Sequence, residues 1–192
     1  PSATELEPGL WAPFHQHILC ARLDMDIDGT SNSVVEVDAF AHPVGPKNPL
    51  GGAYETSETV FATESVAQRV IDPFKNRFWK IINPSRKNHM GKPVGYKLVP
   101  GHTTFPMALP ESVIGRKAGF MYKHLWVTPH VEAESYPAGD YPFQHEGGAG
   151  LPEWTSADRN VDNTDVVLWY VFGTNHIPRI QKEISSKNEC MR

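Results

Sequence analysis

Proline and glycine interrupt this sequence so often that long helices have little room to form. The 192-residue chain contains 17 prolines and 15 glycines, and both residue types are disfavoured inside helices. The short segments between them are rich in β-branched and aromatic residues, which is typical of strands. We therefore predict an all-β protein, an antiparallel β-sandwich with few short helices.

The clearest strand is expected at residues 165–173, where almost no polar residue lies on either face, as in a central strand. Residues 18–27 and 33–40 are predicted to form a hairpin around Asp28-Gly29, a favourable turn pair. The remaining elements that we predict are a second hairpin of residues 78–82 and 93–99, a strand at 121–128, and short helices at 59–69 and 153–160.

Composition excludes some partners. The net charge of −4 gives no reason to expect nucleic acid. No apolar run approaches the roughly 20 residues that a membrane helix needs, so no membrane partner is expected. Cys20 and Cys190 do not make a disulfide framework, and there is no Asn-x-Ser/Thr sequon. The sequence leaves the compartment open.

His15 and His17 are the first chemical signal. Residues two apart in a strand point to the same face, so both imidazoles can converge on one metal ion. Two solvated or core histidines are the alternative interpretation. A third ligand must come from elsewhere, and His176 is the best candidate because it closely follows the strand at 165–173, and rigid elements position ligands well.

Three neutral imidazoles suit Cu(II) or Zn(II), and open coordination positions would make such a site catalytic. We expect no metal role for the other histidines, which are His42, His89, His102, His124, His130 and His145.

A group of carboxylates follows the histidine pair. Asp24, Asp26 and Asp28 alternate along the chain, and alternating carboxylates on one strand face repel each other unless a cation lies among them. Calcium is the kind of hard cation that oxygen ligands favour. The alternative is a solvated strand face that ends in a turn at Asp28.

Several stretches, taken in order, resemble the catalytic domain of the copper amine oxidases, the topaquinone enzymes. The matching stretches are PFHQH at 13–17, ARLD at 21–24, residues 79–84 and 92–101, LWVTP at 125–129, AGDYP at 138–142, residues 150–170, and HIPR at 176–179. The resemblance identifies residues 1–179 as a fragment from the C-terminal part of that domain. Residues 180–192 are expected to be a divergent tail.

The resemblance implies copper ligands at His15, His17 and His176. It also implies a second metal site, usually assigned to calcium in the family. The residues implied for that site are Asp24, Asp26 and Asp165, with the backbone carbonyls of Met25 and Val166. Asp28 then remains a turn residue.

The implied activity is copper- and topaquinone-dependent oxidation of a primary amine by O2, giving an aldehyde, ammonia and hydrogen peroxide. The family's topaquinone precursor lies in a Thr-x-x-Asn-Tyr-Asp/Glu motif before His-x-His, and this chain does not contain that motif. Tyr54 precedes a glutamate but follows His17, so we interpret it as ordinary. The proton-abstracting aspartate also lies upstream in the family. We therefore expect no catalytic residue in this chain, and we expect the isolated chain to be inactive.

The resemblance further implies a homodimer of the full-length protein with exchanged hairpin arms, one of them expected at residues 79–101. Two other interpretations remain at this stage. One is an inactive β-sandwich fragment in which bound metal only supports the fold. The other is a cupin-like mononuclear metal enzyme that uses Glu36 as a further ligand, although this leaves the other matching stretches unexplained.

Overall fold

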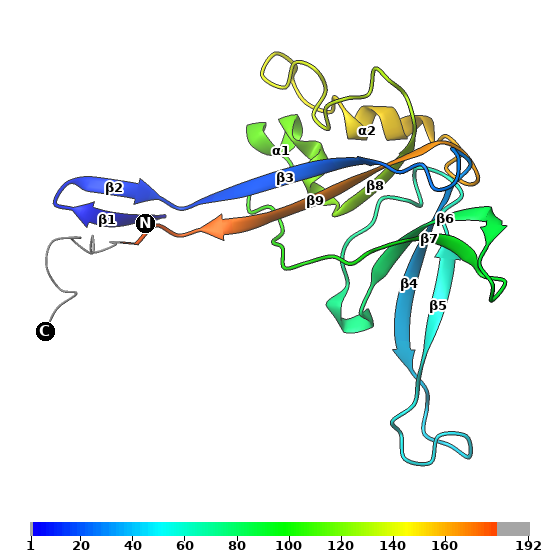
Figure 1. Cartoon of the computed structure of the whole chain (residues 1–192). Coiled ribbons are helices and arrows are strands. Elements are labelled where there is room, and N and C mark those ends of the chain that lie inside the picture. Colours follow the sequence, from blue (N-terminus) through cyan, green and yellow to red (C-terminus); the bar gives the residue numbers. More distant parts are fainter. Residues whose placement is uncertain (1, 180–192) are drawn as a thin grey trace, which may run out of the picture.

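A computed structural model describes residues 2–179 (Figure 1). The tail expected at 180–192 and Cys190 lie outside these residues. The strands of the described part are β1 (Ala3–Glu7), β2 (Leu10–Pro13), β3 (His15–Asp24), β4 (Ser33–Ala41), β5 (Tyr54–Val60), β6 (Phe78–Lys87), β7 (Pro93–Leu98), β8 (Leu125–Pro129) and β9 (Val166–His176). The helices are α1 (Val113–Lys117) and α2 (Leu151–Trp154), with single 3-10 turns at Pro73–Lys75, Gly119–Tyr122 and Thr155–Ala157.

All strand pairing in the described residues is antiparallel. β1 and β2 form a hairpin, β3, β9 and β8 form a three-stranded sheet in that order, and β5, β4, β6 and β7 form a four-stranded sheet. The two larger sheets contribute to one buried cluster, in which Val34 and Trp79 of the second sheet join Leu125 and Leu168 of the first. Each such side chain contributes about 1.5–3 kcal/mol by leaving water. The predicted antiparallel sandwich with few short helices is confirmed.

Strand β9 is central in its sheet, as expected from its apolar sequence. β3 pairs with it in an unbroken register from His15 opposite His176 to Asp24 opposite Val167. Figure 1 shows the two strands as a long ribbon that leaves the body and ends beside the β1–β2 hairpin. Near the body, Trp169 and Val171 of β9 pack under Leu151 of α2. The inner half of the ribbon is therefore held by the core.

The hairpin predicted from residues 18–27 and 33–40 is wrong. β3 pairs with β9, whereas β4 pairs with β5 and β6. The local turn is real, because Asp28 has a positive φ of 49° and Asn32 accepts a hydrogen bond from the Ile27 amide at 3.0 Å. This turn carries the chain from one sheet to the other instead of folding it back on itself.

The helix predicted at 59–69 is also wrong, because Tyr54–Val60 is strand β5 and an irregular segment follows it. The hairpin predicted from 78–82 and 93–99 is confirmed as β6–β7. The helix predicted at 153–160 is found in part as α2 and the turn Thr155–Ala157. The strand predicted at 121–128 begins only at Leu125. No helix among residues 2–179 has the length and apolar character to cross a membrane.

Candidate metal centre

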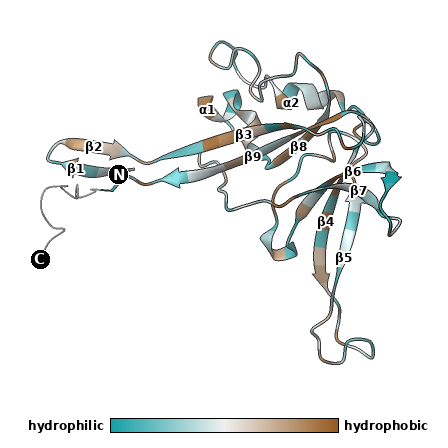
Figure 2. Ribbon diagram, viewed as in Figure 1, coloured by the Kyte–Doolittle hydropathy of each residue, from teal (hydrophilic) through white to brown (hydrophobic). Residues whose placement is uncertain are grey.

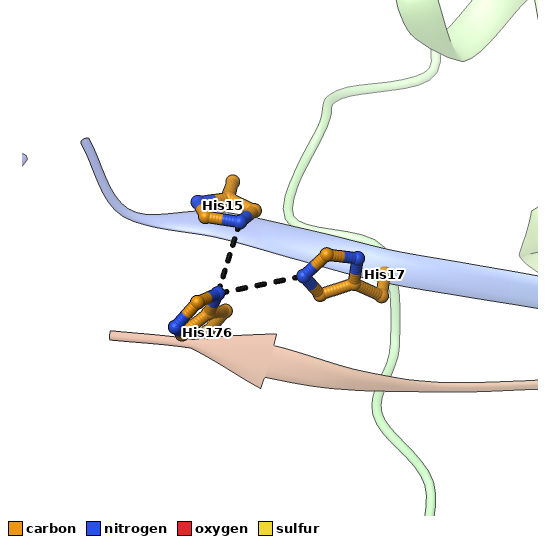
Figure 3. Close-up of side chains that lie close together, drawn as sticks. All are labelled: His15, His17 and His176. Atoms are coloured by element: carbon orange, nitrogen blue, oxygen red, sulfur yellow. Dashed lines mark hydrogen bonds between the residues drawn. The ribbon is translucent and has the colours of Figure 1, made fainter. Parts of the chain in front are cut away.

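Three histidines from two paired strands meet at the outer part of the β3–β9 ribbon. His15 and His17 project from one face of β3, and His176 lies directly opposite His15 at the end of β9. His176 Nδ1 is 3.0 Å from His15 Nε2 and 3.4 Å from His17 Nε2 (Figure 3). All three side chains are exposed. Figure 2 shows these ends of β3 and β9 as hydrophilic. The structure thus brings together the three histidines that the sequence singled out.

The arrangement fits a copper- or zinc-sized ion. Nitrogen ligands about 2.0–2.1 Å from one ion lie roughly 2.9–3.4 Å from one another, which is the spacing of His176 Nδ1 from its two neighbours. A neutral imidazole has one N–H and one lone pair, so His176 Nδ1 cannot satisfy both neighbours through one proton. A cation among the three nitrogens would accept a lone pair from each of them.

The backbone also fixes how His15 presents its ring. His15 Nδ1 lies 3.0 Å from the carbonyl oxygen of Pro13. A carbonyl oxygen can only accept, so Nδ1 carries the proton and Nε2 keeps the lone pair that faces His176. Hydrogen bonds of this kind from the second ring nitrogen orient histidines that bind metals.

A pocket of about 600 Å³ opens beside the histidine cluster. His15 and His176 contribute to its wall, together with Ile18, Met107 and Met121. A larger cavity of about 1030 Å³ lies around Arg116 and His145, and its lining includes none of the candidate ligands. The smaller pocket borders His15 and His176, but much of its lining, including Gln16, Ile18 and Asn175, alternates with the histidines along the two strands, so it opens mainly on the opposite face of the ribbon.

The predicted carboxylate cluster also forms. Asp24 ends β3, Asp26 follows it, and Asp165 immediately precedes β9. Each of the three carboxylates has an oxygen within 4.8 Å of those of the other two. Oxygen atoms at this spacing suit a hard cation. The ligand roles of the Met25 and Val166 carbonyls stay predictions.

His130 is a neighbour of this cluster that sequence reasoning missed. Its Nε2 lies 3.2 Å from Asp24 Oδ2, and its backbone amide donates to the Asp165 carbonyl at 2.8 Å. Arg22 also contacts the Asp24 carboxylate at 3.2 Å. His130 follows the end of β8, and only the pairing of β8 with β9 brings it here. No local pattern around it could have revealed this position.

His124 has a different role. It is buried, and its Nδ1 lies 3.4 Å from the backbone amide of Ile71, from which it accepts. Burial lowers the pKa of His124 below its ordinary 6.5. This neutral ring belongs to the core.

The fold and the histidine cluster together define a β-sandwich domain in which three histidines lie at the spacing of metal ligands. The sequence model described as "Copper amine oxidase, enzyme domain" matches residues 1–183. The chain belongs to this family. Copper is the metal that the family implies, and topaquinone is its typical cofactor.

Characterised relatives agree with this assignment. The chain is 50% identical over 178 residues to histamine oxidase of Arthrobacter globiformis. This alignment covers 92% of this chain and 26% of the relative. It is 40% identical over 183 residues to a peroxisomal copper-containing diamine oxidase of Nicotiana tabacum. That alignment covers 93% of this chain and 23% of the relative. The chain therefore spans about a quarter of the length of these relatives.

A solved structure extends the likeness to three dimensions. The copper-containing benzylamine oxidase of Hansenula polymorpha superimposes with a TM-score of 0.86 at 34% identity. The match covers 94% of this chain and 28% of the benzylamine oxidase.

Proposed function

We propose that this chain is the copper-holding part of a primary amine oxidase, working within a longer protein that converts primary amines and O2 to aldehydes, ammonia and hydrogen peroxide. The observation that carries the proposal is the approach of His176 Nδ1 to His15 Nε2 and His17 Nε2 at 3.0 and 3.4 Å. The relatives named histamine, diamine and benzylamine oxidase support the reaction class.

In this proposal the chain's own residues bind the copper ion and orient its ligands. Antiparallel pairing places His15 opposite His176, and the Pro13 carbonyl keeps the His15 Nε2 lone pair free for the metal. When bound, copper and topaquinone supply the redox chemistry that amino-acid side chains lack. The exposed side of the cluster leaves room for a small molecule to approach.

The proposal places the catalytic tyrosine and aspartate outside this chain. Tyr54 lies on β5 of the four-stranded sheet, whereas all three histidines lie on the other sheet. This location agrees with its interpretation as an ordinary tyrosine. The isolated chain should therefore bind copper without turnover, and as a homodimer the longer protein would exchange arms that include β6–β7.

We further propose that Asp24, Asp26 and Asp165, with the carbonyls of Met25 and Val166, hold calcium. The support is the mutual approach of the three carboxylates and the preference of calcium for an all-oxygen set. Occupancy by calcium would offset the repulsion among the carboxylates and fix the start of β9 against the end of β3.

The cupin-like alternative has no support. Glu36 lies on β4 and is buried, and its carboxylate accepts hydrogen bonds from Arg69 at 2.6 and 2.9 Å and from Trp79 at 3.1 Å. Its carboxylate is therefore engaged by structural partners, and β4 belongs to the sheet that carries none of the three histidines.

A chimera tests the proposed function. The histamine oxidase of Arthrobacter globiformis would carry this chain in place of its matching segment, and peroxide release from histamine would be measured. We expect amine-dependent peroxide, lost in the same chimera with His176→Ala and retained with His89→Ala, an exposed histidine outside the cluster. A folded, copper-loaded chimera that releases no peroxide would contradict the proposal.

A further inference from the structure

Gln16 lies between two candidate ligands and projects from the opposite face of β3. Its Nε2 donates to Asn175 Oδ1 at 2.6 Å and to the Phe105 carbonyl at 2.9 Å. Its Oε1 accepts from the Met107 amide at 2.6 Å. Both N–H groups and the oxygen are matched, so the orientation of this amide is settled by its partners.

Asn175 is the residue directly opposite Gln16 on β9, and it immediately precedes His176. The Gln16–Asn175 pair is thus next to the His15–His176 pair in the register, and its side chains lie on the opposite face of the ribbon. Asn175 Oδ1 also accepts from Thr104 Oγ1 at 3.2 Å. In both of these contacts the Asn175 side chain accepts through Oδ1.

An irregular segment, residues 101–107, covers this reverse side and is tied to β9 at three levels. The Gly101 amide donates to the Tyr170 hydroxyl at 3.1 Å, the Gly173 amide donates to Thr103 Oγ1 at 3.0 Å, and Thr104 contacts Asn175. We call this segment the strap. Gln16 is the side chain through which the strap also holds β3.

The ribbon needs such a fastening at this point because apolar packing is weak there. Phe14 is 44% exposed and Ile177 is 60% exposed, whereas Trp169, farther along β9, is 1% exposed. A one-residue shift between the strands would turn side chains to the opposite face. The side-chain hydrogen bonds of Gln16 and Asn175 therefore help to fix the register of the strand ends that carry the histidines.

We propose that Gln16 and Asn175 are positioning residues for the histidine cluster, which they align from behind through the strap. The inference rests on the proposed copper site. Neither side chain is a metal ligand in it, and their effect passes through the backbones of β3 and β9.

The chemistry of the contacts allows an asymmetric test in the full chain. Gln16→Glu keeps the shape of the side chain but removes both N–H donors and sets a carboxylate oxygen against the Phe105 carbonyl. Asn175→Asp keeps the oxygen that Gln16 and Thr104 use. We therefore expect Gln16→Glu to behave like Gln16→Ala, and Asn175→Asp to behave like the unsubstituted chain, whereas Asn175→Ala does not.

Copper affinity, measured by competition with a chelator, is expected to fall roughly tenfold in Gln16→Ala, Gln16→Glu and Asn175→Ala. The Cu(II) hyperfine splitting in electron paramagnetic resonance should change in the same variants and stay unchanged in Asn175→Asp. Gln144→Ala, at an exposed glutamine for which no side-chain hydrogen bond occurs within residues 2–179, is the matched control. Full copper affinity in Gln16→Glu, or loss in Asn175→Asp equal to that in Asn175→Ala, would overturn the proposal.

Amide hydrogen exchange separates this inference from the proposed function. Gln16→Ala should speed exchange at residues 15–17 and 174–176 without affecting Leu23 and Leu168, with or without copper. A chain that binds no copper but shows this exchange pattern would refute the copper site and leave the positioning role standing. Unchanged exchange at these residues would refute the positioning role.

Discussion

His15 and His176 lie directly opposite each other in the β3–β9 register, with His15 Nε2 3.0 Å from His176 Nδ1. The sequence separates them by most of the chain, so only the pairing of the two strands creates the contact. The proposed metal centre therefore depends on strand register, and changes that disturb the register should affect copper binding before they affect the rest of the fold.

Gly173 tests this dependence. A Cβ at this position would lie 2.4 Å from the His17 carbonyl oxygen, so Gly173→Ala should force β3 and β9 apart and reduce copper binding at least tenfold. The control is Gly45→Ala, because a Cβ at Gly45 would meet no atom within 4 Å. Chelator competition measures both variants, and equal affinities would contradict the prediction.

The carboxylate cluster predicts a calcium site that is independent of copper. Asp165→Asn should weaken calcium binding at least tenfold and leave copper content unchanged, because it removes charge from an all-oxygen ligand set. Asp28→Asn is the matched control, since Asp28 is a turn residue with φ of 49° and asparagine tolerates that conformation. Calorimetric titration with calcium measures the effect. Equal losses in both variants would show that the cluster has been misassigned.

The ion pair between buried Glu64 and Arg159 predicts a large effect of mutation on stability. Glu64 is completely buried, and its carboxylate accepts from the Arg159 side chain at 2.6 and 3.0 Å. Glu64→Ala should lower the free energy of unfolding by about 3–5 kcal/mol, because it removes a buried carboxylate that accepts from both the guanidinium and the backbone amide of Arg159 and leaves Glu134 as the one carboxylate beside that guanidinium within residues 2–179. Glu58→Ala removes an exposed partner of Lys80 and should cost no more than about 1 kcal/mol. Urea unfolding of both variants provides the comparison.

His124 predicts how stability depends on pH. Burial lowers the pKa of His124 in the folded chain below 6.5, so the unfolded chain binds a proton that the folded chain resists. Its contribution to stability is complete above pH 6.5 and is lost as the pH falls through 6.5 toward the lowered pKa. His124→Gln can keep an acceptor for the Ile71 amide and should flatten the fall in urea midpoint between pH 7 and pH 5. An unchanged slope would assign the dependence to other groups.

The histidine cluster could be predicted because its signals are partly local. His15 and His17 share a face by strand periodicity alone, and His176 follows an apolar strand that had to be central. The resemblance to the family then selected the same three residues. Their approach in the structure depends on the β3–β9 register, which no local pattern specifies.

The wrongly predicted hairpin and the missed contact of His130 both arise because strand pairing is not specified locally. Asp28-Gly29 is a turn signal, and the turn exists, but turn residues do not determine which strand pairs with which. β3 takes β9 as its partner along its whole length, and Leu23 of β3 then packs against the core cluster that contains Leu168. His130 was missed for the same reason, since its contact with Asp24 arises only when β8 pairs with β9.

Copper content of the purified chain, measured by elemental analysis after copper addition and dialysis, is the decisive test of the three-histidine site. We predict roughly one copper per chain, retained in His89→Ala and lost in His176→Ala, because removing one of three ligands abolishes the site. Copper that is absent from the unsubstituted chain, or retained equally in both variants, would contradict this prediction.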